Sequence, residues 1–235
     1  GSLLVWAVLQ TCFTAAVAQA KFEKSRPLVP TALAILGLIQ IFFLMLVFFF
    51  SNPFLLLGST PFDGIGLNPL LRNFYMAIHP PTLFLGFVGF SVLFAFAFSA
   101  LIHKDFTRSW ISDLRGFLLF AWVFLTIGNV LGMVWAYEEL GWGGYWGWDP
   151  VENASFLPWL TATAYIHSVM VQERRGMLRV WNLSLLCATF ALTILGTFLT
   201  RSGVLDSVHA FSDSTIGPLL LGFFGLIVLV TVGLI

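Results

Sequence analysis

The stretch HPPTLFLGFVGFSVLFAFAFSALI, residues 79–102, decides the fold, because it runs for 24 residues without an Asp, Glu, Lys or Arg. A helix needs about 20 mostly apolar residues to cross the hydrocarbon core of a bilayer. Working outward from this stretch, the sequence predicts seven spans at residues 3–20, 28–51, 79–102, 117–137, 156–171, 181–200 and 216–235. We therefore expect an all-α fold, a polytopic transmembrane helical bundle with a tryptophan-rich loop or short helix on its outer face.

The composition agrees with an integral membrane protein. Of the 235 residues, 59% are hydrophobic and 9% are charged, and polar residues this sparse could not cover the surface of a soluble domain. The chain opens on an apolar span without a signal-peptide pattern and ends inside another span. We expect residues 1–235 to form a single transmembrane domain that is an excerpt of a longer protein. Cys12 and Cys187 form no CxxC motif and are interpreted as small buried packing residues.

The basic residues predict which loops face the cytoplasm. Nine of the eleven lie in one set of alternate loops, and only Arg72 and Arg201 lie in the other. The first set is 21–26, 103–115 and 172–179, and the second is 52–78, 138–155 and 201–214. With their acidic residues, four in the first set and seven in the second, the two sets have net charges of +5 and −5. Positive loops stay cytoplasmic, so the second set faces outward, into the periplasm if the source is a bacterium. No basic patch remains that would bind nucleic acid.

The outer stretch WGGYWGWDPVEN, residues 142–153, holds more aromatic rings than a membrane interface requires. Tryptophans of an interfacial belt occur singly on helix ends, whereas four rings fall here within seven residues, separated by glycines that permit close approach. These residues are Trp142, Gly143, Gly144, Tyr145, Trp146 and Trp148, with Trp135 and Trp159 on either side. The spacing favours a broad flat shelf for a large planar ligand such as a porphyrin, with an aromatic belt as the alternative.

The residues after the rings predict the start of a helix. Asp149 precedes Pro150, as an N-cap precedes a proline at the first helical position, and Glu152 completes the spacing of a capping box. The helix is therefore expected to start from a fixed position beneath the rings.

The predicted topology divides the four histidines. His79 and His209 lie on the outer side with the tryptophans, and neutral imidazoles are good axial ligands of haem iron. For either residue alone, a hydrogen-bonded interface histidine is the alternative. His103 lies among the cytoplasmic charges. His167 lies inside the fifth span, where an ionisable group is a functional candidate and an interhelical hydrogen bond is the alternative. If it binds a metal or haem, its partner must lie beyond residue 235.

Two arginines are candidates for binding the propionates of a haem. Arg72 and Arg201 are the only basic residues in the outer loops, and each precedes a histidine, His79 or His209, by seven or eight residues. Asp149 would repel propionates, which predicts that the vinyl edge of the haem faces the tryptophan stretch.

The sequence WAYEELGWGGYWGWDPVENASFLPWL, residues 135–160, resembles the WWD motif of the haem-handling proteins of cytochrome c maturation. Together with HPPTLFLGFVGFSV (79–92) and GTFLTRSGVLDSVHAF (196–211), in this order, it resembles the CcmF-type haem lyase subunits and their relative NrfE over nearly the whole chain. The resemblance implies that His79 and His209 are the axial ligands, and so the residues central to catalysis, of a haem held against residues 142–149. It also implies that His167 ligates a separate transmembrane haem b, whose other ligand lies on a later span.

The resemblance further implies a place in the bacterial inner membrane, with the tryptophan loop in the periplasm. The implied partners are the haem chaperone CcmE, CcmH, CcmI and apocytochrome c, whose thiols add to the haem vinyl groups, with quinol as a further candidate and lipid around the spans. Haem b is expected to keep the delivered iron reduced. Two alternatives are a haem transporter and a membrane quinol oxidoreductase subunit. Carboxylates confined to the loops argue against ion-coupled transport, and a quinol subunit would leave the tryptophan stretch without a purpose.

Overall fold

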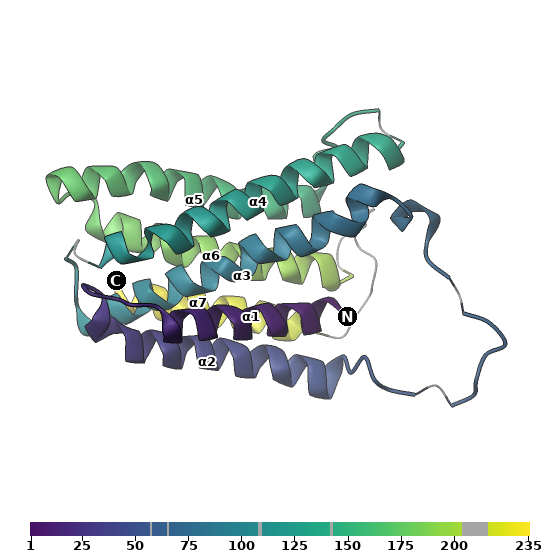
Figure 1. Ribbon diagram of the computed structural model, residues 1–235, viewed down its shortest axis with the longest axis horizontal. Helices are drawn as coiled ribbons and strands as arrows, with labels where there is room; N and C mark the ends of the chain where they lie inside the picture. Colours follow the sequence, from purple (N-terminus) through teal and green to yellow (C-terminus); the bar gives the residue numbers. More distant parts are fainter. Residues whose placement is uncertain (57, 65, 108–109, 142, 204–215) are drawn as a thin grey trace.

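The protein is a bundle of helices that run side by side (Figure 1). The computed structural model describes the chain except residues 57, 65, 108–109, 142 and 204–215. The described residues form seven long helices and no β-strand. They are α1 (Ser2–Gln19), α2 (Val29–Met45), α3 (Phe74–His103), α4 (Ile111–Glu139), α5 (Pro150–Arg175), α6 (Arg179–Arg201) and α7 (Gly217–Leu234). A short helix η1 (Arg26–Leu28) precedes α2, a π-helical segment η2 (Leu46–Phe50) extends it, and a turn η3 (Pro69–Leu71) precedes α3. The prediction of an all-α fold is confirmed.

Six of the described helices are long and apolar enough to cross a membrane, namely all except α5. The fifth predicted span, 156–171, lies within α5 and differs from the expectation. With 26 residues, α5 is about 39 Å long, so its length suffices to cross. Its polar residues, among them Asn153, Gln172 and Glu173, keep it less apolar than the other six helices.

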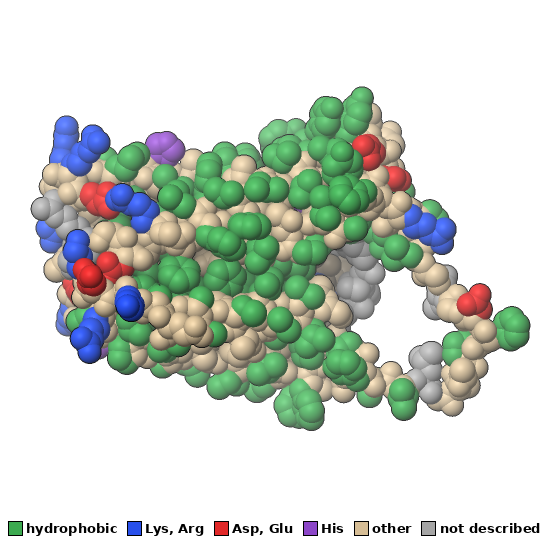
Figure 2. Space-filling view, viewed as in Figure 1, with side chains coloured by type: hydrophobic (Ala, Val, Ile, Leu, Met, Phe, Trp, Pro, Cys, Tyr) green, Lys and Arg blue, Asp and Glu red, His purple; other side chains and the backbone are tan. Residues whose placement is uncertain are grey.

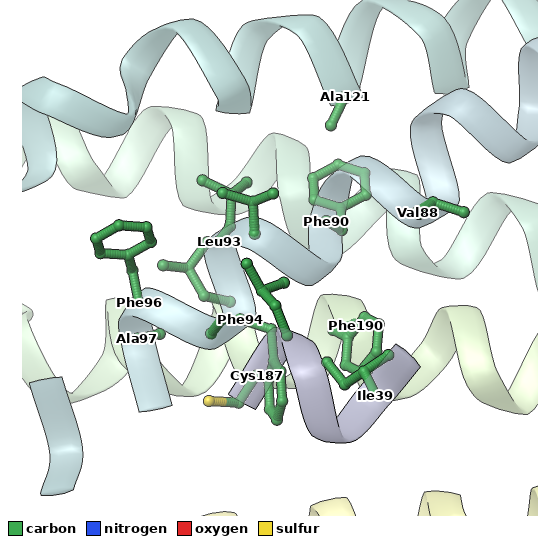
Figure 3. Packing of buried hydrophobic residues seen from close by; sticks show 14 of the residues in the cluster. Ile39, Val88, Phe90, Leu93, Phe94, Phe96, Ala97, Ala121, Cys187 and Phe190 are labelled. Atoms are coloured by element: carbon green, nitrogen blue, oxygen red, sulfur yellow. The ribbon is translucent and has the colours of Figure 1, made fainter. Parts of the chain in front are cut away.

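The helix α3 forms the centre of the bundle. From Gly86 to Leu101 its residues are almost all buried, and it packs against α1, α2, α4 and α6. Figure 3 shows part of the buried cluster, in which Phe90, Leu93, Phe94, Phe96 and Ala97 of α3 lie together with Ile39 of α2, Ala121 of α4, and Cys187 and Phe190 of α6. Cys187 is buried as expected, whereas Cys12 is exposed, which contradicts the expectation for that residue. The rings of Phe94 and Phe190 stack with centroids 4.6 Å apart. Contacts of this kind hold helices together in a membrane, where lipid tails are as apolar as the side chains.

Glycines let α3 and α4 approach closely. A Cβ at Gly86 would lie 2.7 Å from the backbone of Leu125, and one at Gly128 would lie 2.8 Å from the Cα of Leu83. Gly128 and Gly132 have the GxxxG spacing that allows close contact between membrane helices. The close contact fixes the first half of α3 against the second half of α4.

The end of the bundle where α4 begins carries most of the basic residues (Figure 2). There Oδ2 of Asp113 accepts hydrogen bonds from the backbone N–H of Lys24 and from the N–H and Oγ of Ser25, each at 2.9 Å. Arg115 of α4 forms an ion pair with Glu173 of α5, with N–O distances of 2.6 and 2.8 Å. The Asp113 contacts join the α1–α2 connection to α4, and the surface ion pair lies between the end of α5 and α4.

Candidate functional site

A cavity opens at the opposite end of the bundle, between α3, α4, α5 and α6. It encloses about 510 Å³ of empty space, a volume that includes the part open to solvent. Six lining residues bear on its chemistry: His79, Asn129, Gly132, Trp146, Glu152 and Ser155. Two residues that the sequence placed on the outer side, His79 and Trp146, therefore meet at one cavity.

The helix α4 holds His79 in one orientation. Nδ1 of its ring lies 2.7 Å from the carbonyl oxygen of Gly128. A carbonyl oxygen only accepts hydrogen bonds, so Nδ1 carries the proton, and in the neutral imidazole Nε2 carries the lone pair. The ring lies against Gly132, where a Cβ would be 2.8 Å from Cε1 and 3.0 Å from Nδ1. A metal-binding histidine is oriented in the same way, by an acceptor bound to its other nitrogen.

His79 lies inside α3 and not at its start, which differs from the predicted span. The helix begins at Phe74 because Oδ1 of Asn73 caps it, accepting the N–H of Tyr75 at 2.7 Å. Nδ2 of the same residue donates to Glu138 at 2.8 Å and to Glu139 at 3.0 Å, at the end of α4. This amide therefore joins the start of α3 to the end of α4, one and a half turns from His79.

The described rings of the tryptophan stretch do not form a single flat shelf. Trp146 lines the cavity, but its ring meets that of Trp148 at 84°, with centroids 6.3 Å apart. Tyr145 stacks instead on Tyr137 of α4, with centroids 4.4 Å apart and planes 10° from parallel. The backbone turns between successive rings, with φ +69° at Gly143 and +55° at Trp148, and so points them in different directions. The spacing of the rings in the sequence does not contain this information.

The expected start of α5 is confirmed. Asp149 is the N-cap, its Oδ2 accepting the N–H of Val151 at 3.0 Å, and Pro150 occupies the first helical position. Glu152 completes the capping box. Its buried Oε2 also accepts the N–H of Gly147, at 2.9 Å. The helix therefore holds the end of the tryptophan stretch through side chains of its own first turn.

Asn129 adds a polar group to the cavity that no local sequence pattern suggests. The residue is only 9% exposed, and its Oδ1 lies 2.7 Å from the hydroxyl of Ser155. Its Nδ2 has no hydrogen-bond partner in the part of the chain that the structure describes. A buried amide without an acceptor is destabilising, so Asn129 suits a cavity that receives a polar atom of a ligand or a water molecule.

Trp135 lies outside the lining of this cavity. Its side chain is fully buried in a cluster with Ala136 and Leu140, and its Nε1 donates to the carbonyl oxygen of Leu70 at 3.0 Å. It therefore holds the turn η3, which directly precedes Arg72.

The two arginines that the sequence predicts on the outer side differ in their surroundings. Arg72 is exposed, and its Nε donates to the carbonyl oxygen of Leu67 at 3.2 Å. Arg201 is the last residue of α6, next to Thr200, which lines the cavity. Gly144 is partly exposed in the loop before Trp146. Two further predicted site residues, Trp142 and His209, lie outside the described residues.

His167 lies away from the cavity, on the exposed surface of α5. It is 15 residues beyond Glu152, about 22 Å along the helix axis. Its Nδ1 lies 2.8 Å from the carbonyl oxygen of Thr163, one turn earlier in the same helix. The contact fixes the tautomer with the lone pair on Nε2. His103, at the basic end, has its Nε2 2.9 Å from the hydroxyl of Thr31.

Fold and cavity together define a polytopic helical membrane protein with an oriented histidine and a tryptophan beside one ligand cavity. The profile of the family described as Cytochrome C assembly protein matches residues 1–205, and the chain belongs to this family.

Several cytochrome c biogenesis proteins are similar to the chain. The chain is 50% identical to the cytochrome c-type biogenesis protein CcmF of Pseudomonas aeruginosa over 230 residues, 97% of this chain and 35% of that protein. It is 48% identical to CcmF of Escherichia coli, over 97% of this chain and 36% of that protein. NrfE of Haemophilus influenzae is 44% identical over 100% of this chain and 37% of that protein. A solved structure titled Cytochrome c Heme Lyase CcmF matches 100% of this chain and 35% of that chain, with a TM-score of 0.78 and 38% identity.

These matches confirm the resemblance to CcmF-type proteins and to NrfE. The chain spans about a third of the length of the curated relatives it matches.

Proposed function

We propose that this chain forms the haem-binding membrane domain of a haem lyase in cytochrome c maturation. The observation that carries the proposal is the cavity shared by His79 and Trp146, in a chain that belongs to the cytochrome c assembly family. Haem is the substrate of this site: it is received, oriented and handed to an apocytochrome c.

The residues of the cavity fit a haem. Haem iron takes four ligands from the porphyrin and needs one or two axial ligands from the protein. The tautomer set by Gly128 gives His79 a lone pair on Nε2, as an axial ligand requires. Trp146 supplies an apolar ring beside it. Asn129 supplies a buried amide for a polar atom.

We assign the remaining roles from the sequence and the contacts together. His209 is proposed as the second axial ligand. The loop residues Trp142, Gly143, Gly144, Tyr145, Trp148 and Asp149 are proposed to surround one edge of the haem with Trp146. Trp135 positions the turn before Arg72, and is a positioning residue rather than a haem contact in this proposal.

Electrostatics orient the substrate. Carboxylates gather on the tryptophan side of the site, where Asp149 and Glu152 lie. Arg72 and Arg201 are the basic residues of the outer loops, and they are proposed to bind the two propionates. The vinyl edge then points toward the tryptophan loop. Thioether formation requires the vinyl groups to be held beside two cysteine thiols, so this chain would act by binding and orienting haem.

A second haem is proposed in the membrane. His167 would ligate a haem b, because it lies exposed on α5 with the same tautomer as His79. The other ligand would come from a segment outside this chain. This haem would keep the delivered iron reduced.

The wider setting follows from family membership. We propose that residues 1–235 form one domain of a longer protein in the bacterial inner membrane, with the tryptophan loop in the periplasm. The proposed partners are CcmE, CcmH, CcmI and apocytochrome c, with quinol as a candidate reductant.

Spectra of the full-length protein test the proposal. Purified protein is titrated with haem, and absorbance is compared for His79→Ala, His209→Ala, His167→Ala and the control His103→Ala. The proposal predicts that the first two variants lose the signal of haem bound at the cavity, that His167→Ala loses a separate b-type signal, and that His103→Ala resembles the parent. If His79→Ala bound haem like the parent, the proposal would be wrong.

A further inference from the structure

Trp148 has a backbone conformation that its own chemistry disfavours. Its φ is +55°, in the left-handed region where a bulky side chain is strained. The other described non-glycine residues with positive φ, Lys104 and Leu178, flank helix ends. Strained conformations persist only where the surroundings impose them, and they concentrate at ligand sites.

Two consecutive side chains of α5 impose this conformation. Oε2 of Glu152 accepts the N–H of Gly147 at 2.9 Å and the N–H of Asp149 at 3.2 Å, the residues on either side of Trp148. Nδ2 of Asn153 donates to the carbonyl oxygen of Trp148 itself at 3.1 Å. The backbone is therefore held before, at and after the strained residue.

The result of this arrangement is a tryptophan that projects from the protein. The Trp148 side chain is 72% exposed, although it is large and apolar. Its ring meets the ring of Trp146 edge to face, and Trp146 lines the cavity together with Glu152. A strained backbone that presents an apolar ring to solvent beside a ligand cavity is unfavourable for the free protein and useful for contact with an apolar ligand.

We infer that Glu152 and Asn153 are positioning residues that hold the Trp148 ring, with Trp146, in the place where it contacts the apolar edge of haem. This inference rests on the proposed function. Glu152 holds the loop as a hydrogen-bond acceptor, because its Oε2 accepts from the backbone N–H groups of Gly147 and Asp149. Asp149 has a separate task, since its side chain caps α5 at the N–H of Val151.

If Glu152 acts as an acceptor, its substitution by Gln and its substitution by Ala should affect haem binding differently. In Glu152→Gln, the amide oxygen can still accept from Gly147 and Asp149, so most of the haem affinity is retained. In Glu152→Ala, both acceptor contacts are lost. Loss of two backbone hydrogen bonds is expected to weaken haem binding at the cavity by about tenfold or more. Asn153→Ala, which loses one contact, is expected to weaken it less.

A double-mutant cycle separates positioning from a general structural role. Haem is titrated into the full-length protein carrying Glu152→Ala, Trp148→Ala or both, and any haem b signal reports whether each variant is folded. If Glu152 acts by placing the Trp148 ring, Glu152→Ala has little further effect once Trp148→Ala is present. Asp63→Ala is the control, because among the described residues that exposed carboxylate accepts a hydrogen bond only from its neighbour Gly64, at 2.7 Å.

Three results would overturn the inference. The first is a pair of effects that multiply in the double variant, and the second is a Glu152→Gln protein that binds haem as weakly as Glu152→Ala. The third is a Glu152→Ala protein that keeps the haem. Failure of the proposed function gives a different pattern, in which His79→Ala binds haem like the parent. If His79→Ala loses the haem and Glu152→Ala keeps it, only the positioning role is wrong.

Discussion

Gly132→Ala is predicted to displace the histidine of the cavity. The added Cβ would lie 2.8 Å from Cε1 and 3.0 Å from Nδ1 of His79, while ordinary contact begins at 3.4 Å, so the ring has to move by at least 0.6 Å. The ring cannot move without changing the 2.7 Å contact between Nδ1 and the carbonyl oxygen of Gly128, one turn away on α4. Separation of the two helices is resisted by contacts such as that of Gly86 with the backbone of Leu125.

The size of the effect follows from these contacts. Overpacking costs about 1–3 kcal/mol, and the lost hydrogen bond costs about 1 kcal/mol. The part that falls on the haem-bound state is expected to lower haem affinity by about tenfold to a hundredfold, at about 1.4 kcal/mol per factor of ten.

Haem titration of the full-length protein measures this effect. Gly116→Ala is the matched control, because it lies on the same helix and its added Cβ meets nothing within 4 Å. Equal haem affinity in Gly132→Ala and Gly116→Ala would refute the claim that α4 sets the position of His79.

Three further predictions concern other parts of the molecule. Arg72→Ala and Arg201→Ala should each weaken haem binding, because each removes a proposed propionate contact. When the protein is titrated with a haem whose propionates are esterified, each variant and the parent should have nearly the same affinity. A difference in affinity as large as that for unmodified haem would contradict the proposed propionate contacts. Trp135→Phe should lower the stability of the packed turn η3 by about 1 kcal/mol, because the Nε1 hydrogen bond is lost. Limited proteolysis in residues 52–73 should then be faster than in the parent, and an unchanged rate would contradict this prediction. Arg115→Ala should change the melting temperature very little, because the Arg115 side chain is 60% exposed and an exposed ion pair stabilises by less than about 1 kcal/mol. A large drop in melting temperature would show that the ion pair with Glu173 contributes strongly to stability.

Local patterns in the sequence were enough to predict most of the fold. Apolar runs of sufficient length located the helices, because crossing a bilayer imposes a minimum length on each span. The start of α5 was predicted to the residue, since Asp149, Pro150 and Glu152 satisfy the helix end through neighbours in the chain. The start of α3 was missed because it depends on Asn73, which also bonds to the distant end of α4.

The candidate site was predicted only in part, for a related reason. Topology could place His79 and the tryptophans on one side, and the structure brings His79 and Trp146 to one cavity. The orientation of the rings could not be predicted from a sequence pattern, because it follows from the φ of Trp148 and from contacts across the loop. The close contact of Gly132 with another helix could have been predicted from its GxxxG spacing with Gly128. No sequence pattern points to Asn129 as a residue of the cavity.

Replacement of the proposed axial ligand tests most directly whether His79 binds haem iron. A methionine in place of an axial histidine raises the reduction potential of haem, so the potential and spectrum of the haem at the cavity are measured in His79→Met and, for comparison, in His103→Met. We expect a higher potential and an altered spectrum in His79→Met alone. An unchanged potential and spectrum in that variant would contradict this expectation.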